Sequence, residues 1–124
     1  MSLVSIGDAE IYTEIHGEGE DLLLVAGLGG MATFWANQVE FLSQHYRVIL
    51  HDHRGVGRST PAPIICSAVE MADDLIALME AMDISSAHIV GHSTGGAIGQ
   101  NIALKRASGP TCLGLQLWCH PHIR

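Results

Sequence analysis

Basic residues are scarce in this sequence, which has 6 Lys and Arg against 13 Asp and Glu and a formal net charge of −7. Nucleic-acid binding requires a basic face, so this balance argues against a nucleic-acid partner. Long apolar runs are missing too. None approaches the roughly 18 residues that span a bilayer, and no membrane partner is expected. With 48% apolar and 15% charged residues, the chain suits a globular protein, and we predict a single domain over residues 1–124.

Cysteine is also rare. Cys66, Cys112 and Cys119 are odd in number and form no C-x-x-C pair, which argues against a disulfide framework. No basic-then-apolar leader follows Met1. A reduced, cytoplasmic setting is therefore predicted.

Acidic residues are absent from the last third of the chain, where none follows Asp83. This absence matters because of the segment Val90–Gly96, which has the form G-x-S-x-G with Ser93 at its centre. An apolar run at 87–90 precedes it and a predicted helix follows, which is the strand–turn–helix context of a nucleophile elbow. Small residues let strand and helix approach closely around a strained serine, a role suited to Gly91, Gly95 and Gly96. The pattern predicts a serine hydrolase with Ser93 as nucleophile.

The partners of that serine are missing. Where a nucleophile elbow carries the serine, a carboxylate and then a histidine follow it along the chain. The serine needs the histidine as its base and the carboxylate to orient that histidine. His120 and His122 lie downstream, but no downstream carboxylate can orient them. The triad acid and base are therefore not expected in this chain, and we expect it alone to have little or no triad-level activity.

A glycine-rich segment, Gly27–Gly30, directly follows the continuous apolar run at 22–26. Acyl transfer needs backbone N–H groups aimed at the developing oxyanion, one from the residue after the nucleophile and one from such a loop. Thr94 and Leu28 are the candidate donors. A simple glycine-rich turn is the alternative interpretation of this segment.

A second glycine-containing loop, residues 51–59, contains an H-x-H pattern and several polar side chains. A phosphate-binding loop would lead straight into a helix, whereas Pro61 and Pro63 follow here. A zinc site would need a third and a fourth ligand, and none is predicted; nor is any other cofactor. The preferred interpretation is a polar loop in which Asp52 and Arg54 brace the backbone near the site. His92, next to the serine on a sharp turn, is expected to be a packing or lining residue.

Hydrophobic periodicity predicts an opening hairpin and then alternating strands and helices. The expected strands cover 3–6, 10–16, 22–26, 46–50, 87–90 and an apolar run at 112–119, and the expected helices cover 33–43, 67–82 and 97–107. This order predicts an α/β fold, with a mostly parallel sheet and helices on both faces.

Three motifs in order, at 24–30, 52–59 and 90–96, resemble the N-terminal half of an α/β-hydrolase. The chain is most similar to the small-molecule hydrolases near 3-oxoadipate enol-lactonase and aminoacrylate hydrolase. The resemblance implies a small ester, lactone or related carbonyl substrate and no cofactor. It also implies that residues 1–124 form a single partial domain, without the C-terminal strands and lid. Ala26 departs from the family, which usually has histidine there.

Two other interpretations stay open. The chain could be an inactive, truncated hydrolase that acts as a binding or partner module, self-associating through an exposed sheet edge. Alternatively, it could be a complementing fragment whose partner supplies Asp and His. Substitution of Ser93 by alanine separates the first from an enzyme, because a binding module would not lose its function.

Overall fold

The structure, a computed structural model, describes residues 1–59, 63, 67–106 and 114–118, and for the last five the backbone alone. Several residues singled out in the sequence lie outside the described residues, namely Pro61, Cys66, Cys112, Cys119, His120 and His122.

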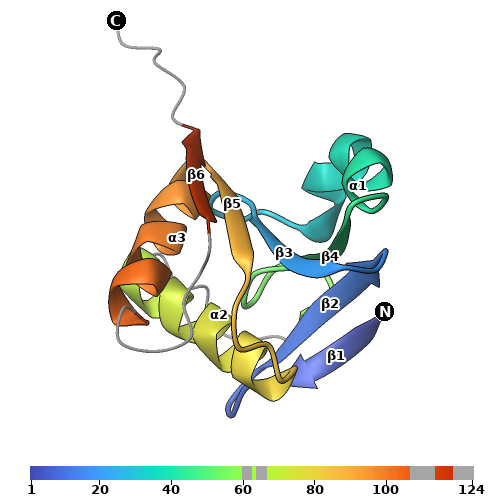
Figure 1. Cartoon of the computed structure of the whole chain (residues 1–124). Coiled ribbons are helices and arrows are strands. Elements are labelled where there is room, and N and C mark those ends of the chain that lie inside the picture. The colour runs from blue at the N-terminus through green and yellow to red at the C-terminus, as the bar shows by residue number, and fades with distance from the viewer. Residues whose placement is uncertain (60–62, 64–66, 107–113, 119–124) are drawn as a thin grey trace, which may run out of the picture.

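Six strands form a single sheet in the order β1-β2-β4-β3-β5-β6 (Figure 1). The strands are β1 (Ser2–Ser5), β2 (Glu10–His16), β3 (Glu20–Val25), β4 (Tyr46–His51), β5 (His88–His92) and β6 (Gly114–Trp118). The pairings of β2 with β1 and with β4 are antiparallel, and all others are parallel. The predicted opening hairpin and mostly parallel sheet are confirmed.

The helices are η1 (Ala32–Trp35, a 3₁₀-helix), α1 (Ala36–Leu42), α2 (Ala68–Ala81) and α3 (Thr94–Lys105). The single helix predicted at 33–43 is thus a 3₁₀ turn that continues as an α-helix. The predicted start of the second helix at 67 is confirmed, since Ser67 is the N-cap of α2 and its Oγ accepts from the Glu70 N–H at 3.5 Å. The predicted start of the last helix at 97 is wrong. α3 begins at Thr94, because the turn at Ser93 leads directly into the helix.

The core has two layers, one on each face of the sheet, and β3 shows why. Leu23 and Val25 point to the side covered by α2 and α3, where they pack with residues such as Leu75 and Ile98. Leu22 and Leu24 point to the opposite side, covered by η1 and α1. Strand side chains alternate between faces, so a strand covered on both sides must be apolar throughout. Figure 1 shows α2 and α3 together on one face and α1 on the other.

The parallel direction of β3, β4 and β5 positions three loops together. The segment 26–31 follows β3, the segment 52–59 follows β4, and Ser93 follows β5. Carboxyl ends of parallel strands meet at one edge of a sheet, where α/β folds form their ligand sites. Within the described ranges, none of the helices is both long and apolar enough to cross a membrane.

Candidate active site

Ser93 occupies the single-residue turn between β5 and α3, with φ of 56° and ψ of −122°. This backbone conformation is strained for a residue other than glycine, and residues strained in this way cluster at functional sites. The side chain is exposed. Its hydroxyl has no hydrogen-bond partner within the described part of the chain. The turn therefore holds the serine hydroxyl out at the carboxyl edge of the sheet.

Glycines at Gly91 and Gly95 make the turn possible. A Cβ on Gly91 would lie 2.3 Å from the Gly95 carbonyl oxygen, and a Cβ on Gly95 would lie 2.1 Å from the Val25 carbonyl oxygen. Both distances are far inside van der Waals contact with backbone atoms. Gly96, also buried, donates its N–H to the Ser93 carbonyl at 2.9 Å and closes the turn.

The loop after β3 lies beside Ser93. A Cβ on Gly27 would lie 3.5 Å from Ser93 Cβ and 3.9 Å from Ser93 Oγ. Leu28 comes next in this loop and is 56% exposed. Thr94 is the first residue of α3, where the N–H groups have no partner inside the helix. The structure thus brings the loop containing Leu28 and the start of α3 together around the serine.

His92 lies on the other side of the elbow. Its ring stacks on Phe34 with centroids 4.8 Å apart, and Phe34 in turn packs edge-on against Trp35 at 5.0 Å. These residues, with Asn37, line an open groove between η1–α1 and β5. His92 therefore packs along that groove.

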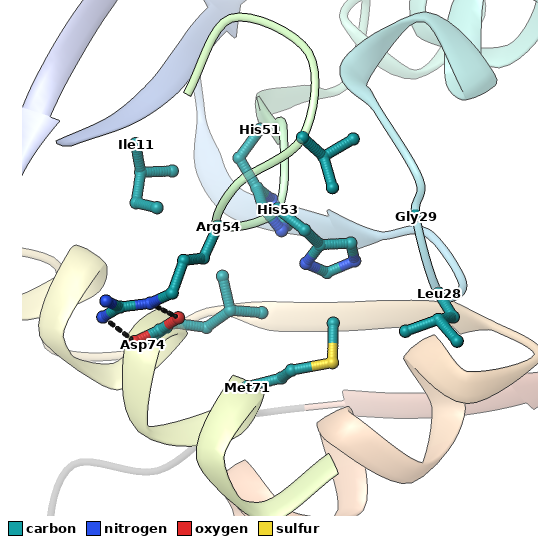
Figure 2. Close-up of a pocket in the computed structure, with 10 residues that line it drawn as sticks. Ile11, Leu28, Gly29, His51, His53, Arg54, Met71 and Asp74 are labelled. Carbon is teal, nitrogen blue, oxygen red and sulfur yellow. Dashed lines mark hydrogen bonds and ion pairs between the residues drawn. The ribbon is translucent and has the colours of Figure 1, made fainter. Parts of the chain in front are cut away.

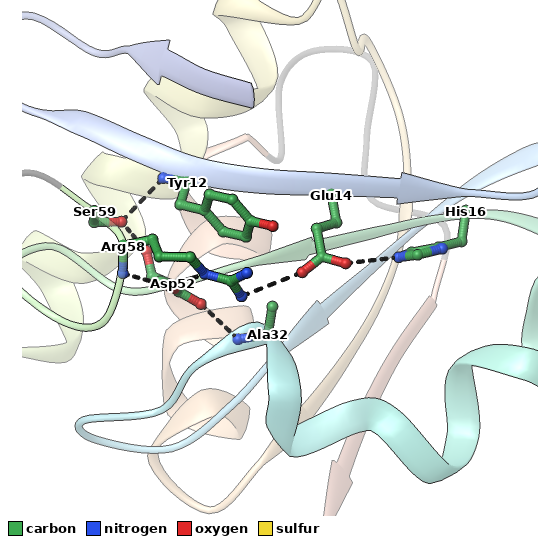
Figure 3. A network of polar contacts seen from close by, with 7 residues as sticks. All are labelled: Tyr12, Glu14, His16, Ala32, Asp52, Arg58 and Ser59. Carbon is green, nitrogen blue, oxygen red and sulfur yellow. Dashed lines mark hydrogen bonds and ion pairs between the residues drawn. The ribbon is translucent and has the colours of Figure 1, made fainter. Parts of the chain in front are cut away.

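Asp52 is fully buried and binds backbone on two sides (Figure 3). One carboxylate oxygen accepts from the Ala32 N–H at 2.7 Å, and the other accepts from the Arg58 N–H at 2.8 Å. Ser59 Oγ donates to the Asp52 carbonyl at 2.7 Å and accepts from the Tyr12 N–H at 3.0 Å. The carboxylate therefore ties the loop after β4 to the beginning of η1. Its neighbour Arg58 also stacks over the Tyr12 ring at 3.7 Å.

Arg54 points toward α2, where it meets Asp74 (Figure 2). Its guanidinium donates two hydrogen bonds to Asp74, at 2.7 and 2.9 Å, and a third to Asp8 at 3.0 Å. The hydrogen bonds to Asp74 raise the pKa of Arg54 above its ordinary value. Arg54 was expected to brace backbone. Its partners are instead two carboxylates, which fasten the loop to α2 and to the β1–β2 turn.

Two buried histidines carry interactions that the sequence did not reveal. His53 Nε2 lies 2.9 Å from the Ala26 carbonyl oxygen. His51 is buried with neither ring nitrogen hydrogen-bonded within the described residues, and its ring meets His53 edge-on at 4.8 Å. Burial lowers the pKa of His53. The pKa of His51 is lowered well below its ordinary value, mainly by burial and to a smaller extent by the nearby His53. Both rings line a small pocket with Leu28 and Gly29 that has room for about one water molecule (Figure 2).

Among the residues that the structure describes, no three His, Cys, Asp or Glu side chains lie close enough together to hold a metal ion.

A family model for the alpha/beta hydrolase fold matches residues 22–119 of the chain, a range that includes all three loops. The chain belongs to the α/β-hydrolase fold family. The fold predicted from the sequence, an N-terminal portion of this hydrolase sheet, is therefore confirmed.

Relatives within the α/β-hydrolase family include a protein of Azorhizobium caulinodans named “Putative carbamate hydrolase RutD”. It is 47% identical over 98 residues, which are 79% of this chain and 37% of that protein. Among solved structures, the enol-lactonase from Burkholderia xenovorans LB400 superposes with a TM-score of 0.80 at 31% identity, over 90% of this chain and 44% of that one. Est816, an N-acyl homoserine lactone degrading enzyme, superposes with a TM-score of 0.78 at 28% identity, over 94% of this chain and 42% of that one.

The chain spans less than half the length of these relatives, and it matches their N-terminal portion. The names of these relatives refer to different substrates, so membership of the family fixes the fold more narrowly than the substrate.

Proposed function

We propose that Ser93 is the nucleophile of a hydrolase that acts on a small ester, lactone, carbamate or related carbonyl compound. The observation that carries the proposal is the strained, exposed serine between β5 and α3. In the first step Ser93 Oγ bonds to the carbonyl carbon as its proton passes to a base. The leaving group then departs with a proton, and water hydrolyses the acyl-enzyme.

The backbone N–H groups of Leu28 and Thr94 are proposed to stabilise the oxyanion. Two features support this: the Gly27 backbone packs against Ser93, and Thr94 begins a helix whose first N–H groups are free of intrahelical bonds. A helix N-terminus also carries positive potential that favours a developing negative charge.

The base and its orienting acid are proposed to come from outside residues 1–124. The sequence has no Asp or Glu beyond Asp83, and the relatives are more than twice as long as the matched segment. With the base outside this range, residues 1–124 would contribute the nucleophile and the proposed oxyanion donors, and another segment would take the serine proton. Weak residual hydrolysis is the most that residues 1–124 support alone.

The substrate class rests on the relatives, whose names include a carbamate hydrolase, an enol-lactonase and a homoserine-lactone degrading enzyme. All three kinds of substrate share a small, polarised carbonyl group. A cofactor is not part of the proposed mechanism, because the attack and the charge stabilisation use the chain's own hydroxyl and amide groups.

Acylation by p-nitrophenyl acetate tests the nucleophile. We expect peptide mass spectrometry to find an acetyl group on Ser93 in the unmodified chain, and on the same residue in Ser85→Ala. Ser85 is the matched control, because it is exposed at the opposite end of β5. Ser93→Ala should lose the label. If Ser93 is acetylated no faster than Ser85, the proposal is wrong for this chain.

A second candidate function is a binding module without catalysis, favoured by the open edge of the sheet. β6 lies at the end of the strand order and pairs only with β5 among the described strands. An unpaired edge offers backbone groups to another chain. We propose that the chain self-associates through this edge, in a cytoplasmic setting. Light scattering across a dilution series should then give a mass that falls with concentration, whereas a constant monomer mass would contradict it.

A further inference from the structure

We propose that His53 is a positioning residue that holds the loop 26–31 in the shape that presents the Leu28 N–H to Ser93. The proposal rests on the proposed function, since the shape of this loop matters for catalysis only if Leu28 is an oxyanion donor. His53 follows the neighbouring strand β4 and reaches across to the loop after β3.

His53 holds this loop at two points. Its Nε2 lies 2.9 Å from the Ala26 carbonyl oxygen, and its own backbone N–H donates to the Gly30 carbonyl at 3.3 Å. A carbonyl oxygen can only accept, so the hydrogen must sit on Nε2. Asp52, one residue earlier, binds the Ala32 N–H at the far end of the same loop. Consecutive residues of one loop therefore fix both ends of the other.

The geometry of the peptide unit turns this clamp into an orientation for Leu28. The Gly27 carbonyl accepts from the Gly30 N–H at 2.9 Å, which closes the turn between the two points held by His53. In a planar trans peptide the C=O and the following N–H point in opposite directions. With the Gly27 carbonyl turned inward to Gly30, the N–H of Leu28 points outward and is available to a ligand.

Burial makes the clamp hard to replace with water. His53 is 5% exposed, its ring meets the His51 ring edge-on, and it lines the same pocket as Leu28 and Gly29. Burial also lowers the pKa of His53, with opposing effects from the Ala26 hydrogen bond and from Asp74 and Asp52. The ring is therefore neutral near pH 7, with Nε2–H as its donor.

The test begins with the unmodified chain. Long-range 1H–15N spectra assign the tautomer of His53 directly, and a hydrogen on Nδ1 instead of Nε2 would overturn the proposal. Two variants follow. His53→Gln keeps an N–H at a similar reach, whereas His53→Leu removes it. The 15N order parameters of Leu28 and Gly29 should stay at about 0.85 in the unmodified chain and in His53→Gln, and should fall below about 0.6 in His53→Leu. The amides of Leu23 and Ile49 report whether the core remains folded.

Binding of phenylboronic acid adds a functional measurement, because the boronate that forms on a serine oxygen mimics the tetrahedral oxyanion. We expect its dissociation constant to rise about tenfold in His53→Leu and to recover to within about threefold in His53→Gln, which is the range of one hydrogen bond. Equal affinities in all three proteins would contradict the proposal.

Failure of the proposal and failure of the proposed function remain distinguishable. Ser93→Ala should abolish boronate binding and leave the order parameters of Leu28 unchanged. If the unmodified chain itself binds no boronate, the nucleophile and oxyanion site fail for this chain. The tautomer and the loop order in the two His53 variants still decide whether His53 holds the loop.

Discussion

The backbone of Gly95 approaches the Val25 carbonyl so closely that a Cβ on Gly95 would lie 2.1 Å from that oxygen. This contact joins the first turn of α3 to the last residue of β3 and fixes where the helix starts relative to the loop that follows β3. Ser93 and Gly27 are neighbours because these two elements meet here.

Replacement of Gly95 by alanine should therefore destabilise the protein by about 1–3 kcal/mol, the usual cost of overpacking, since backbone must move to admit the methyl group. Urea unfolding followed by circular dichroism measures this loss. Ala97→Ser is the control, because it adds one heavy atom to an exposed position of the same helix and should change the free energy of unfolding by less than about 0.5 kcal/mol.

Backbone strain at Ser93 predicts that a glycine there, unlike the loss of the glycine at Gly95, makes the protein more stable. With φ at 56° and ψ at −122°, Ser93→Gly relieves the strain of a Cβ, while Ser93→Ala keeps it. We expect the glycine variant to be more stable than the alanine variant by about 1 kcal/mol. Both remove the hydroxyl, so the comparison isolates the backbone. Equal stabilities in thermal unfolding would show that the turn stores no strain.

The Arg54–Asp74 ion pair predicts that two adjacent carboxylates, Asp73 and Asp74, contribute unequally to the stability of the protein. Asp74 is 14% exposed and accepts two hydrogen bonds from Arg54, whereas Asp73 is 60% exposed and pairs with Lys105. Asp74→Asn should cost about 1.5–3 kcal/mol, the range for charged hydrogen bonds. Asp73→Asn should cost less than about 1 kcal/mol, because an exposed ion pair contributes little. Similar losses in the two variants would contradict the structural role assigned to Arg54.

The buried histidines predict a loss of stability in acid. Burial lowers the pKa values of His51 and His53 in the folded state, so below about pH 6.5 the unfolded chain binds protons that the folded chain does not. The free energy of unfolding should therefore fall as the pH drops from about 7 to 5, by up to about 1.4 kcal/mol per pH unit for each histidine.

The variant His51→Phe tests this dependence. This variant should make the free energy of unfolding depend less steeply on pH. It should not lower the stability at pH 7, because the two buried ring nitrogens that it removes have no partner among the described residues. His45→Gln is the control, since His45 is exposed and lies outside the buried pair. Urea unfolding at several pH values measures both. If the free energy of unfolding depends on pH equally steeply in His51→Phe, His51 does not contribute to the loss of stability in acid.

Local patterns were sufficient for most of the secondary structure. The continuous apolar run at 22–26 gave the buried strand β3, because a strand covered on both faces cannot alternate. Ser67 and Glu70 gave the start of α2 through a local hydrogen bond. The start of α3 was missed by three residues. The glycines there disfavour a helix in isolation, and only packing against β3 makes that turn helical.

For the candidate site, the sequence itself determined the elbow motif, the order of the three loops and the absence of a downstream carboxylate, since these depend on residues near one another in the chain. Tertiary structure alone decided that Asp52 binds Ala32, that Arg54 turns to Asp74, and that His53 reaches Ala26. Each of these contacts joins residues 20 or more positions apart. Such partners are chosen by strand order and register, which bring the loops after β3, β4 and β5 to one edge of the sheet, and no local pattern encodes that choice.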